Sequence, residues 1–466
     1  MPKKSSLLLY PCCDTIILMI NQSIFKSYDV RGIYPTELNE EAAFAVGSAF
    51  VRKTGAKSVV IGHDTRLSSP ELFKGLARGV ISEGAQVYDI GKTSTEGLYF
   101  AVGNYEYPSG IMVTASHNPK EYNGFKMLQR INGNIEMVRG VELIPLIVES
   151  ASAKEPLEAM EEEQVFKKDI WQDFTKYVLA SADLAEIVPL KIVIDASNGV
   201  GGLMVSKIQD KLPVEIIPLN FEPDGNFPNH SPNPLEKGSA DKIGEMVKKE
   251  NADFGLMFDG DADRIFLVDE NGQLVSADIT LLFLAKFFLQ KNPGMSVAYN
   301  AICSKAVPEF IEKWGGKPIR TKVGFVNVRE GLLKNNGIMG GELSGHYCYK
   351  DYYYMDSGII SFLTLLQIIA KDGRKVSEIV KEFSVYAKSA ENNFKVVDKD
   401  AILEKIKEKY VDGKQDFLDG ITVEYADWWF NVRPSNTEPV LRLTVEADTP
   451  EILDKKIKEL TKVIIK

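Results

Sequence analysis

Short apolar runs alternate with amphipathic segments along most of the chain. Apolar runs that predict buried strands lie within residues 57–64, 85–90, 110–115, 190–202, 254–261 and 296–301. Between the first two, Ser69 and Pro70 predict the capped start of a helix that ends at Gly84. Because the alternation repeats, the sequence predicts three successive α/β domains of similar size with mixed sheets. Open sheets of this class bind ligands at the carboxyl ends of their strands.

The pattern changes toward the C-terminus. Residues 421–432 and 440–447 alternate apolar and polar positions as antiparallel strands do, and a helix capped at Thr449 follows them. This part predicts a smaller α+β domain. The acidic stretch 151–164 is typical of an exposed helix or linker, and Asn271-Gly272 predicts a hairpin turn near a second boundary.

Composition narrows the classes of function. The chain has 466 residues and a net charge of −10, with no long run of Lys or Arg, so neither nucleic acid nor a membrane is an expected partner. The most apolar later stretch, 279–290, is too short to cross a bilayer and predicts a buried helix. The four cysteines of the chain form no CxxC pair, which fits a reducing cytoplasm. An acidic chain that binds phosphate must gather positive charge locally.

Residues 1–20 begin basic and become apolar, which faintly resembles a signal peptide. Pro11 and Asp14 interrupt the apolar part, and no cleavage site of small residues follows. We expect an ill-defined extension upstream of a natural start near Met19. A signal or membrane anchor is the alternative.

The sequence TASHNP, residues 114–119, follows an apolar run and contains adjacent Ser116 and His117. On an extended turn these two side chains would point in different directions, which places His117 poorly for deprotonating Ser116. The GxSxG elbow of serine hydrolases is absent here. The segment therefore argues against a triad hydrolase, and a plain capped turn is the alternative.

A second polar segment, FDGDADR at 258–264, places Asp259, Asp261 and Asp263 at alternate positions after an apolar run. Three carboxylates this close repel one another and require a cation, and oxygen ligands suit Mg²⁺. Arg264 stands where an EF-hand needs glycine, and a cation beside a metal favours a bound anion such as phosphate. The segment predicts a divalent-metal site, with a solvated acidic turn as the alternative.

Two further turns carry clustered polar groups. GELSGH at 341–346 offers groups that can bind hydroxyls, namely Glu342, Ser344 and His346. RPSNTEP at 433–439 offers a set that suits a phosphate, namely Arg433, Ser435, Asn436 and Thr437. Each could also be an ordinary turn if taken alone.

TASHNP, DGDADR, GELSGH and RPSNTEP, in this order and at these intervals, resemble the motifs of the α-D-phosphohexomutase family, most closely its phosphomannomutase/phosphoglucomutase branch. The resemblance extends from YDVRG at 28–32 to RPSNTEP and beyond. It implies four domains around a central cleft, each giving one loop. These would be a phosphoserine domain at 21–152, a metal-binding domain at 153–269, a sugar-recognition domain at 270–385 and a phosphate-binding domain at 386–466, after the extension at 1–20.

The resemblance also implies residue roles. Ser116 resembles the family's phosphoserine, and the three aspartates resemble ligands of one Mg²⁺ that the phosphoserine completes. Glu342 and Ser344 resemble the residues that read O3 and O4 of the sugar. The turn at Arg433, Ser435, Asn436 and Thr437 resembles the loop that holds the phosphate that is not reacting. Groups expected near the reacting phosphate are Arg31, Lys126, His117 and Arg264.

The implied reaction interconverts hexose 1-phosphate and hexose 6-phosphate, of mannose, glucose or both. Phosphoserine would give its group to the free hydroxyl, and the resulting hexose 1,6-bisphosphate, which also serves as activator, would reorient in the cleft. Mg²⁺ and the cations would neutralise the transferring group. Lys126 or His346 would move the proton, and the sequence does not rank them. The expected enzyme is a cytoplasmic monomer or homodimer that binds small sugar phosphates.

Two positions depart from the family pattern. Phe325 and Ile302 stand where many relatives have histidine and lysine, respectively. The loss of these two polar contacts puts the preferred sugar in question more than the type of reaction. Lys322 or Lys305 would compensate for the lost contacts. Asn436 favours the mannose/glucose branch, because the phosphoglucosamine branch usually has glycine there. The alternatives are a phosphoglucosamine mutase, a sugar-phosphate sensor without turnover, and a net phosphatase.

Overall fold

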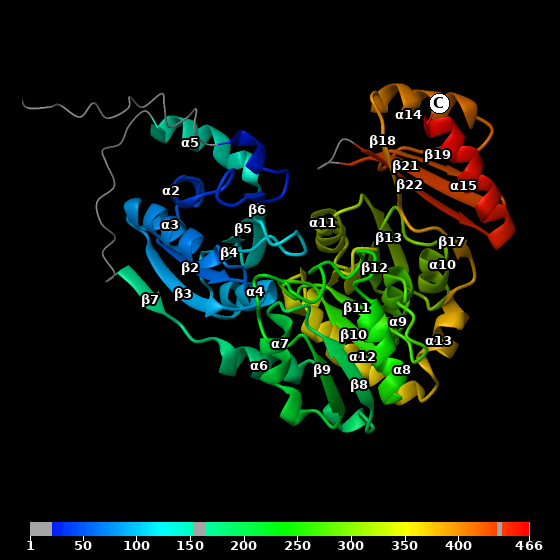
Figure 1. Ribbon diagram of the computed structural model, residues 1–466, viewed down its shortest axis with the longest axis horizontal. Coiled ribbons are helices and arrows are strands. Elements are labelled where there is room, and N and C mark those ends of the chain that lie inside the picture. The colour runs from blue at the N-terminus through cyan, green and yellow to red at the C-terminus, as the bar shows by residue number, and fades with distance from the viewer. Residues whose placement is uncertain (1–20, 152–163, 436–439, 466) are drawn as a thin grey trace, which may run out of the picture. The chain divides into compact units, whose positions relative to one another are not determined.

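The computed structural model describes residues 21–151, 164–435 and 440–465. Its chain divides into two compact units (Figure 1). Unit 1 contains the described residues up to Gln172 together with Pro223–Pro228, and unit 2 contains Asp173–Glu222 and the chain from Asn229 onward. The predicted extension at 1–20, the boundary between 152 and 153, and the site residues Asn436 and Thr437 lie outside the described residues.

Unit 1 is built on one mixed sheet of seven strands in the order β1-β5-β4-β2-β3-β7, with β6 paired to β5. The strands are β1 (Val30–Ile33), β2 (Ser58–His63), β3 (Gln86–Lys92), β4 (Ser109–Val113), β5 (Tyr122–Ile131), β6 (Asn134–Val138) and β7 (Val165–Lys167). Strands β4, β2, β3 and β7 run parallel, and β5 is antiparallel to its three neighbours. The strands predicted within 57–64, 85–90 and 110–115 are confirmed as β2, β3 and β4.

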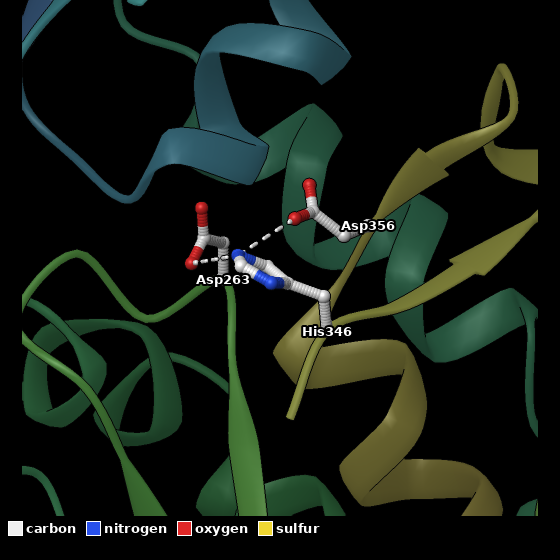
Figure 2. A group of neighbouring side chains, drawn as sticks. All are labelled: Asp263, His346 and Asp356. Carbon is white, nitrogen blue, oxygen red and sulfur yellow. Dashed lines mark ion pairs between the residues drawn. The ribbon is translucent and has the colours of Figure 1, made fainter. Parts of the chain in front are cut away.

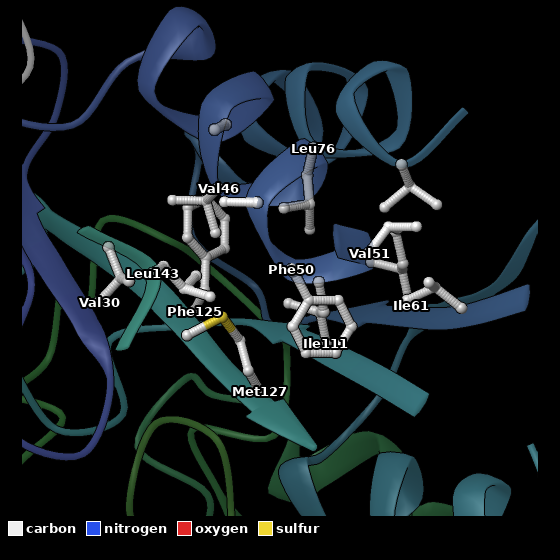
Figure 3. Close-up of a cluster of buried hydrophobic side chains, with 14 of the residues drawn as sticks. Val30, Val46, Phe50, Val51, Ile61, Leu76, Ile111, Phe125, Met127 and Leu143 are labelled. Atoms are coloured by element: carbon white, nitrogen blue, oxygen red, sulfur yellow. The ribbon is translucent and has the colours of Figure 1, made fainter. Parts of the chain in front are cut away.

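The helices of unit 1 are α2 (Glu40–Thr54), α3 (Ser69–Ser82), α4 (Thr95–Asn104) and α5 (Ile144–Ala151), with short 3₁₀ turns η1 (Gln22–Ile24) and η2 (Gly140–Leu143). Helices α2 and α3 pack side by side, and glycine permits their close approach. A Cβ on Gly79 would lie 2.0 Å from the carbonyl oxygen of Phe44. Figure 3 shows Phe50 of α2 and Leu76 of α3 packed toward Ile111 of the sheet, in the buried core of this unit.

Unit 2 contains three sheets, with strand orders β11-β10-β8-β9, β13-β12-β14-β15-β16 and β17-β22-β21-β20-β19, the last with β18 paired to β22. The first sheet has β8 (Lys191–Asp195), β9 (Glu215–Leu219), β10 (Phe254–Phe258) and β11 (Ile265–Val268). The second has β12 (Ser296–Asn300), β13 (Lys317–Thr321), β14 (Met339–Gly341), β15 (Tyr347–Tyr349) and β16 (Met355–Asp356). The third has β17 (Ala387–Lys388), β18 (Asn392–Lys395), β19 (Lys414–Asp416), β20 (Ile421–Glu424), β21 (Trp428–Pro434) and β22 (Val440–Ala447).

The first two of these sheets mix parallel and antiparallel pairs, and the third is antiparallel throughout. This distribution confirms three α/β sheets followed by a C-terminal α+β part, as the sequence predicts. Asn271-Gly272 does form a hairpin turn: Gly272 has a φ of 74° and its N–H donates to the carbonyl of Asp269 at 2.9 Å.

The helices that accompany these sheets are α6 (Trp171–Ala180), α7 (Gly201–Ser206), α8 (Asp241–Glu250), α9 (Ala277–Lys291), α10 (Ala306–Lys313), α11 (Phe325–Asn335), α12 (Gly358–Asp372), α13 (Val376–Phe383), α14 (Lys399–Lys409) and α15 (Pro450–Ile465). The 3₁₀ turns are η4 (Leu184–Glu186), η5 (Gln209–Lys211) and η6 (Lys350–Tyr352). Helix α9 is the buried helix predicted at 279–290, and it packs against α12. Among the described residues, no helix is both long and apolar enough to cross a membrane.

Candidate active site

Ser116 lies in a short turn after β4, within what we call the Ser116 loop (residues 114–119). Its φ of 51° is left-handed, a conformation that costs a residue other than glycine about 1–3 kcal/mol. The N–H of Ser116 donates to Thr114 Oγ1 at 2.9 Å, and the side chain is 1% exposed. The sequence-based view that Ser116 and His117 point apart is wrong: because the backbone is left-handed and not extended, Ser116 Oγ lies 3.3 Å from His117 Nδ1.

One buried arginine fixes the backbone of the Ser116 loop. Arg66, in the loop after the parallel strand β2, is 1% exposed. Its guanidinium donates to four carbonyl oxygens, those of Ser116 (2.8 Å), Asn118 (2.6 Å), Pro119 (2.7 Å) and Tyr122 (2.9 Å). The Arg66 Cζ atom also lies 5.2 Å from the ring centroid of Phe227. Arg66 is not among the site residues expected from the sequence, although Asp64 and Arg66 form a charged pair directly after a predicted strand.

Asp64 completes this support from the same loop. Its carboxylate accepts hydrogen bonds from Thr114 Oγ1 at 2.7 Å and Ser69 Oγ at 2.8 Å, and it pairs with Arg66 Nε at 3.2 Å. Ser69 is therefore not the helix cap that the sequence predicts. Ser68 precedes α3, and the hydroxyl of Ser69 is committed to Asp64.

Two cations that the sequence did predict, Arg31 and Lys126, also lie in unit 1. Arg31 of β1 donates to Asn118 Oδ1 at 2.6 Å and to Asp29 Oδ2 at 2.6 Å, so the structure brings Arg31 to the Ser116 loop. Lys126 of β5 is 9% exposed, and its Nζ donates to Thr95 Oγ1 at 3.4 Å. Because β5 pairs with both β1 and β4, both cations belong to strands that adjoin this loop.

In unit 2, Asp259, Asp261 and Asp263 follow β10 in the acidic loop (residues 259–264). One carboxylate oxygen of each lies within 4.8 Å of the others, and all three side chains are buried. Arg264 Nε lies 3.5 Å from Asp259 Oδ2 and 3.9 Å from Asp263 Oδ1, so one cation offsets part of the negative charge. Three buried carboxylate donors on one short loop fit a hard divalent cation and leave positions for further ligands.

His346 joins the acidic loop to a third sequence motif. Its Nε2 lies 3.5 Å from Asp263 Oδ1 and 3.5 Å from Asp356 Oδ2, and Figure 2 shows the ring between these two carboxylates. Arg264 Nε also lies 3.2 Å from this nitrogen. Burial and Arg264 act to lower the pKa of His346, but Asp263 and Glu342 outweigh them and raise it to about 9. Asp356 is not among the site residues expected from the sequence, and β16 brings it beside the site by pairing with β15.

Glu342 lies at the other nitrogen of His346, in the Glu342 loop (residues 342–346). His346 Nδ1 is 3.1 Å from Glu342 Oε1, the hydroxyl of Ser344 donates to the same oxygen, and the N–H of Gly324 donates to Oε2 at 3.1 Å. Burial acts to raise the pKa of Glu342, but His346 and Ser344 lower it to about 2. The structure thus brings the predicted groups of DGDADR and GELSGH into one cluster.

One of the two residues that depart from the family pattern, Phe325, lies next to this cluster. Phe325 begins α11, and its ring centroid is 5.7 Å from that of His346. Ile302 is buried, whereas Lys322 is exposed. Lys305 forms an ion pair with Glu424, with Nζ 3.2 Å from Oε1.

The RPSNTEP turn begins at the end of β21. Arg433 is 6% exposed, and its Nη2 donates to Glu391 Oε2 at 2.7 Å. Arg442, directly opposite on β22, donates to the other oxygen of Glu391 at 2.9 Å. The N–H of Ser435 donates to the carbonyl of Val440 at 3.0 Å. Glu391 and Arg442 are not among the site residues expected from the sequence.

Comparison with known proteins shows the class to which this fold and these loops belong. The chain matches all four domain models of the phosphoglucomutase/phosphomannomutase family: alpha/beta/alpha domain I at residues 22–142, domain II at 172–272, domain III at 276–386 and the C-terminal domain at 391–463.

Individual relatives agree with these matches. A phosphomannomutase of Methanocaldococcus jannaschii is 36% identical over 444 residues, which cover 95% of this chain and 98% of the relative. A phosphomannomutase/phosphoglucomutase of Pseudomonas aeruginosa is 35% identical and covers 93% of both chains. The crystal structure of a phosphoglucomutase/phosphomannomutase family protein from Burkholderia thailandensis superposes with a TM-score of 0.85 at 31% identity, covering 96% of this chain and 97% of the other.

These matches define a mutase of hexose phosphates, an isomerase of carbohydrate metabolism. The chain belongs to the phosphoglucomutase/phosphomannomutase family.

Proposed function

We propose that this chain interconverts the 1- and 6-phosphates of mannose, glucose or both, through a phosphoserine at Ser116 and a hexose 1,6-bisphosphate that reorients before it returns a phosphate. The observation that carries the proposal is the fixed backbone conformation of Ser116. Its hydroxyl belongs to a left-handed turn whose carbonyls Arg66 fixes, with Arg31 on the same loop. A rigid serine beside cations suits a phosphoryl group that is stored and transferred again.

The acidic loop supports a metal role within this proposal. Asp259, Asp261 and Asp263 would hold one Mg²⁺, which would offset the charge on the phosphoryl group. The three carboxylates are buried and mutually close, and Arg264 adds a fixed positive charge beside them. Arg264 and His117 would contact the reacting phosphate.

The remaining residues would bind and orient the sugar phosphate. Glu342 and Ser344 would read the sugar hydroxyls, and Arg433, Ser435, Asn436 and Thr437 would grip the phosphate that is not reacting. Lys126 or His346 would move the hydroxyl proton. The exposed Lys322 would add positive charge for binding the sugar phosphate. Both nitrogens of His346 face charged groups, which fixes the ring's orientation. The domain limits at 21–152, 153–269, 270–385 and 386–466, a central cleft, a cytoplasmic location and a monomer or homodimer stay predictions.

The test is ³¹P NMR of the purified protein with Mg²⁺ and a trace of hexose 1,6-bisphosphate. Mannose 1-phosphate, glucose 1-phosphate and glucosamine 1-phosphate are supplied separately. We expect the first two to become 6-phosphates, and Ser116→Ala to abolish conversion because it removes the phosphoryl acceptor. Ser109→Ala is the matched control, because this buried serine donates to the carbonyl of Ser58 on the same sheet.

Other outcomes would contradict specific parts of the proposal. Conversion of glucosamine 1-phosphate alone would show a different sugar preference. Binding of all three without turnover would show a sensor, and release of inorganic phosphate in place of a 6-phosphate would show a phosphatase.

A further inference from the structure

We propose that Ser197 is a positioning residue for the metal site. It belongs to the Asp195 loop (residues 195–200), which follows β8 and holds the acidic loop after β10 in the shape that binds the ion. This inference rests on the metal role in the proposed function, and it assigns a task to a loop that no part of that function uses.

The two loops leave the same edge of one sheet. Strands β8 and β10 are parallel neighbours, and Asp195 at the end of β8 pairs with Met257 near the end of β10. The chain therefore enters both loops at the same level. Side chains and N–H groups of the Asp195 loop are within reach of the carbonyls of the acidic loop.

Hydrogen bonds from the Asp195 loop fix the acidic loop on both sides of Asp259. The hydroxyl of Ser197 donates to the carbonyl of Phe258 at 2.6 Å. The N–H of Val200 donates to the carbonyl of Gly260 at 3.2 Å. Because Phe258 and Gly260 flank Asp259, these two bonds set the direction in which the first carboxylate leaves the backbone.

The two loops also touch through their backbones. A Cβ on Gly199 would lie 2.4 Å from the carbonyl oxygen of Gly260, a distance that real side chains do not show. The contact therefore leaves no room for a compensating shift of the acidic loop toward the Asp195 loop. If a hydrogen bond between the two loops is lost, the acidic loop can therefore shift only away from the Asp195 loop.

The orientation of Ser197 is itself fixed by a buried carboxylate. Ser197 has a left-handed φ of 52°, and its N–H donates to Asp195 Oδ1 at 2.8 Å. The same oxygen accepts from Asn220 Nδ2 at 3.0 Å, and Oδ2 lies 3.0 Å from His230 Nε2. Asp195 and Ser197 are 0% and 1% exposed, so water does not replace these partners.

Electrostatics explains why this support matters for a metal. Three buried carboxylates repel one another, so the acidic loop without an ion tends to spread. The hydroxyl of Ser197 opposes that spreading by holding the Phe258 carbonyl. Groups that orient metal ligands from behind typically change metal affinity by about 10–100-fold when they are removed.

The experiment measures Mn²⁺ binding to the full chain by electron paramagnetic resonance, without substrate, for the unaltered protein and three variants. We expect Ser197→Ala and Ser197→Gly each to weaken binding by about 10–100-fold. Glycine adopts the left-handed conformation readily, so Ser197→Gly removes the hydroxyl without adding backbone strain. Ser109→Ala, which removes a buried serine hydroxyl from unit 1, should bind as the unaltered chain does.

Unchanged Mn²⁺ affinity in Ser197→Gly would overturn the inference while leaving the metal role of the aspartates in place. A lower melting temperature with unchanged affinity would likewise mean that Ser197 only stabilises the fold. If the unaltered chain bound no Mn²⁺, the metal role in the proposed function would be wrong, and this inference with it.

Discussion

Arg66 shows how a single side chain organises a functional turn. Five of its hydrogen bonds go to Asp64 Oδ2 and to the carbonyls of the Ser116 loop and Tyr122. The planar guanidinium can serve these acceptors together because its donors point outward in one plane. An ammonium has neither the reach nor the geometry, so lysine would not substitute here.

We expect Arg66→Met to lower the free energy of unfolding by about 3–5 kcal/mol, because it leaves the buried Asp64 carboxylate without its cation. Turnover should fall as well, since the Ser116 loop loses three hydrogen bonds at once and the carbonyl of Tyr122 loses a fourth. The measurement is urea unfolding together with the mutase assay. The control is Arg130→Met, which breaks a more exposed ion pair with Glu106 and should cost at most about 1 kcal/mol. Equal losses in the two variants would contradict the role given to Arg66.

At the scale of elements, two of the candidate functional loops are each held by the loop after a neighbouring parallel strand. The loop after β2 holds the Ser116 loop after β4, and the Asp195 loop after β8 holds the acidic loop after β10. Parallel pairing makes this possible, because it places successive loops at one sheet edge. The strand that presents a functional group and the strand that steadies it are therefore different.

The segment after β9 is tied to the Asp195 loop by a titratable pair. His230 Nδ1 lies 2.7 Å from the carbonyl of Ser231 and so carries a proton, while Nε2 faces Asp195 at 3.0 Å. Burial and Lys242 lower the pKa of His230, but Asp195 and the Ser231 carbonyl outweigh them and raise it above its ordinary value. Protonated histidine is thus favoured in the folded state.

A raised folded-state pKa contributes stability that is fully present below the ordinary pKa of about 6.5 and is lost as pH rises through the folded value. We expect the unfolding free energy of the unaltered chain to fall, as the pH rises above about 6.5, by more than that of His230→Gln. Denaturant unfolding at several pH values checks this, and the difference between the two proteins cancels other titrations. Parallel pH profiles would contradict the pairing of His230 with Asp195.

The sequence predicted the elements that depend on local pattern and missed those that depend on tertiary contact. Ser116 and the three aspartates stand in short motifs directly after apolar runs, so their places at strand ends could be predicted. Arg66 and Glu391 act on residues far away in the chain, and no spacing indicates which partner they meet. Asp356 reaches His346 because β16 pairs with β15, a register that the sequence pattern does not show. The geometry of Ser116 and His117 was mispredicted because one left-handed φ reverses the expected directions.

Within unit 2, a buried ion pair connects helix α9 to the third sheet. Lys388 of β17 forms an ion pair with Asp278 of α9, whose other contacts include the N–H of Ser304 at 2.9 Å. Burial acts to raise the pKa of Asp278, but Lys388 outweighs it and lowers the pKa. Lys388 is also mostly buried, so each charge depends on the other.

We expect Lys388→Met to lower the free energy of unfolding of unit 2 by about 3–5 kcal/mol, because Asp278 keeps its charge and loses its partner. Hydrogen exchange with mass spectrometry distinguishes the units, and unit 1 should keep its protection. Lys334→Met is the matched control, because its ion pair with Glu330 is exposed and contributes little. Equal exchange in both variants, or faster exchange confined to unit 1, would count against this account.

Unit 1 is built from two separate segments of the chain, and this affects how the protein folds during translation. Residues Pro223–Pro228 belong to unit 1, and Phe227 lies beneath Arg66, yet the rest of that unit ends at Gln172. A ribosome adds about 5–20 residues per second, so several seconds pass between the emergence of Gln172 and that of Phe227. During that interval the nascent unit 1 lacks the Phe227 ring that packs against Arg66. Part of unit 2 must therefore be translated before all the residues of unit 1 are available for folding.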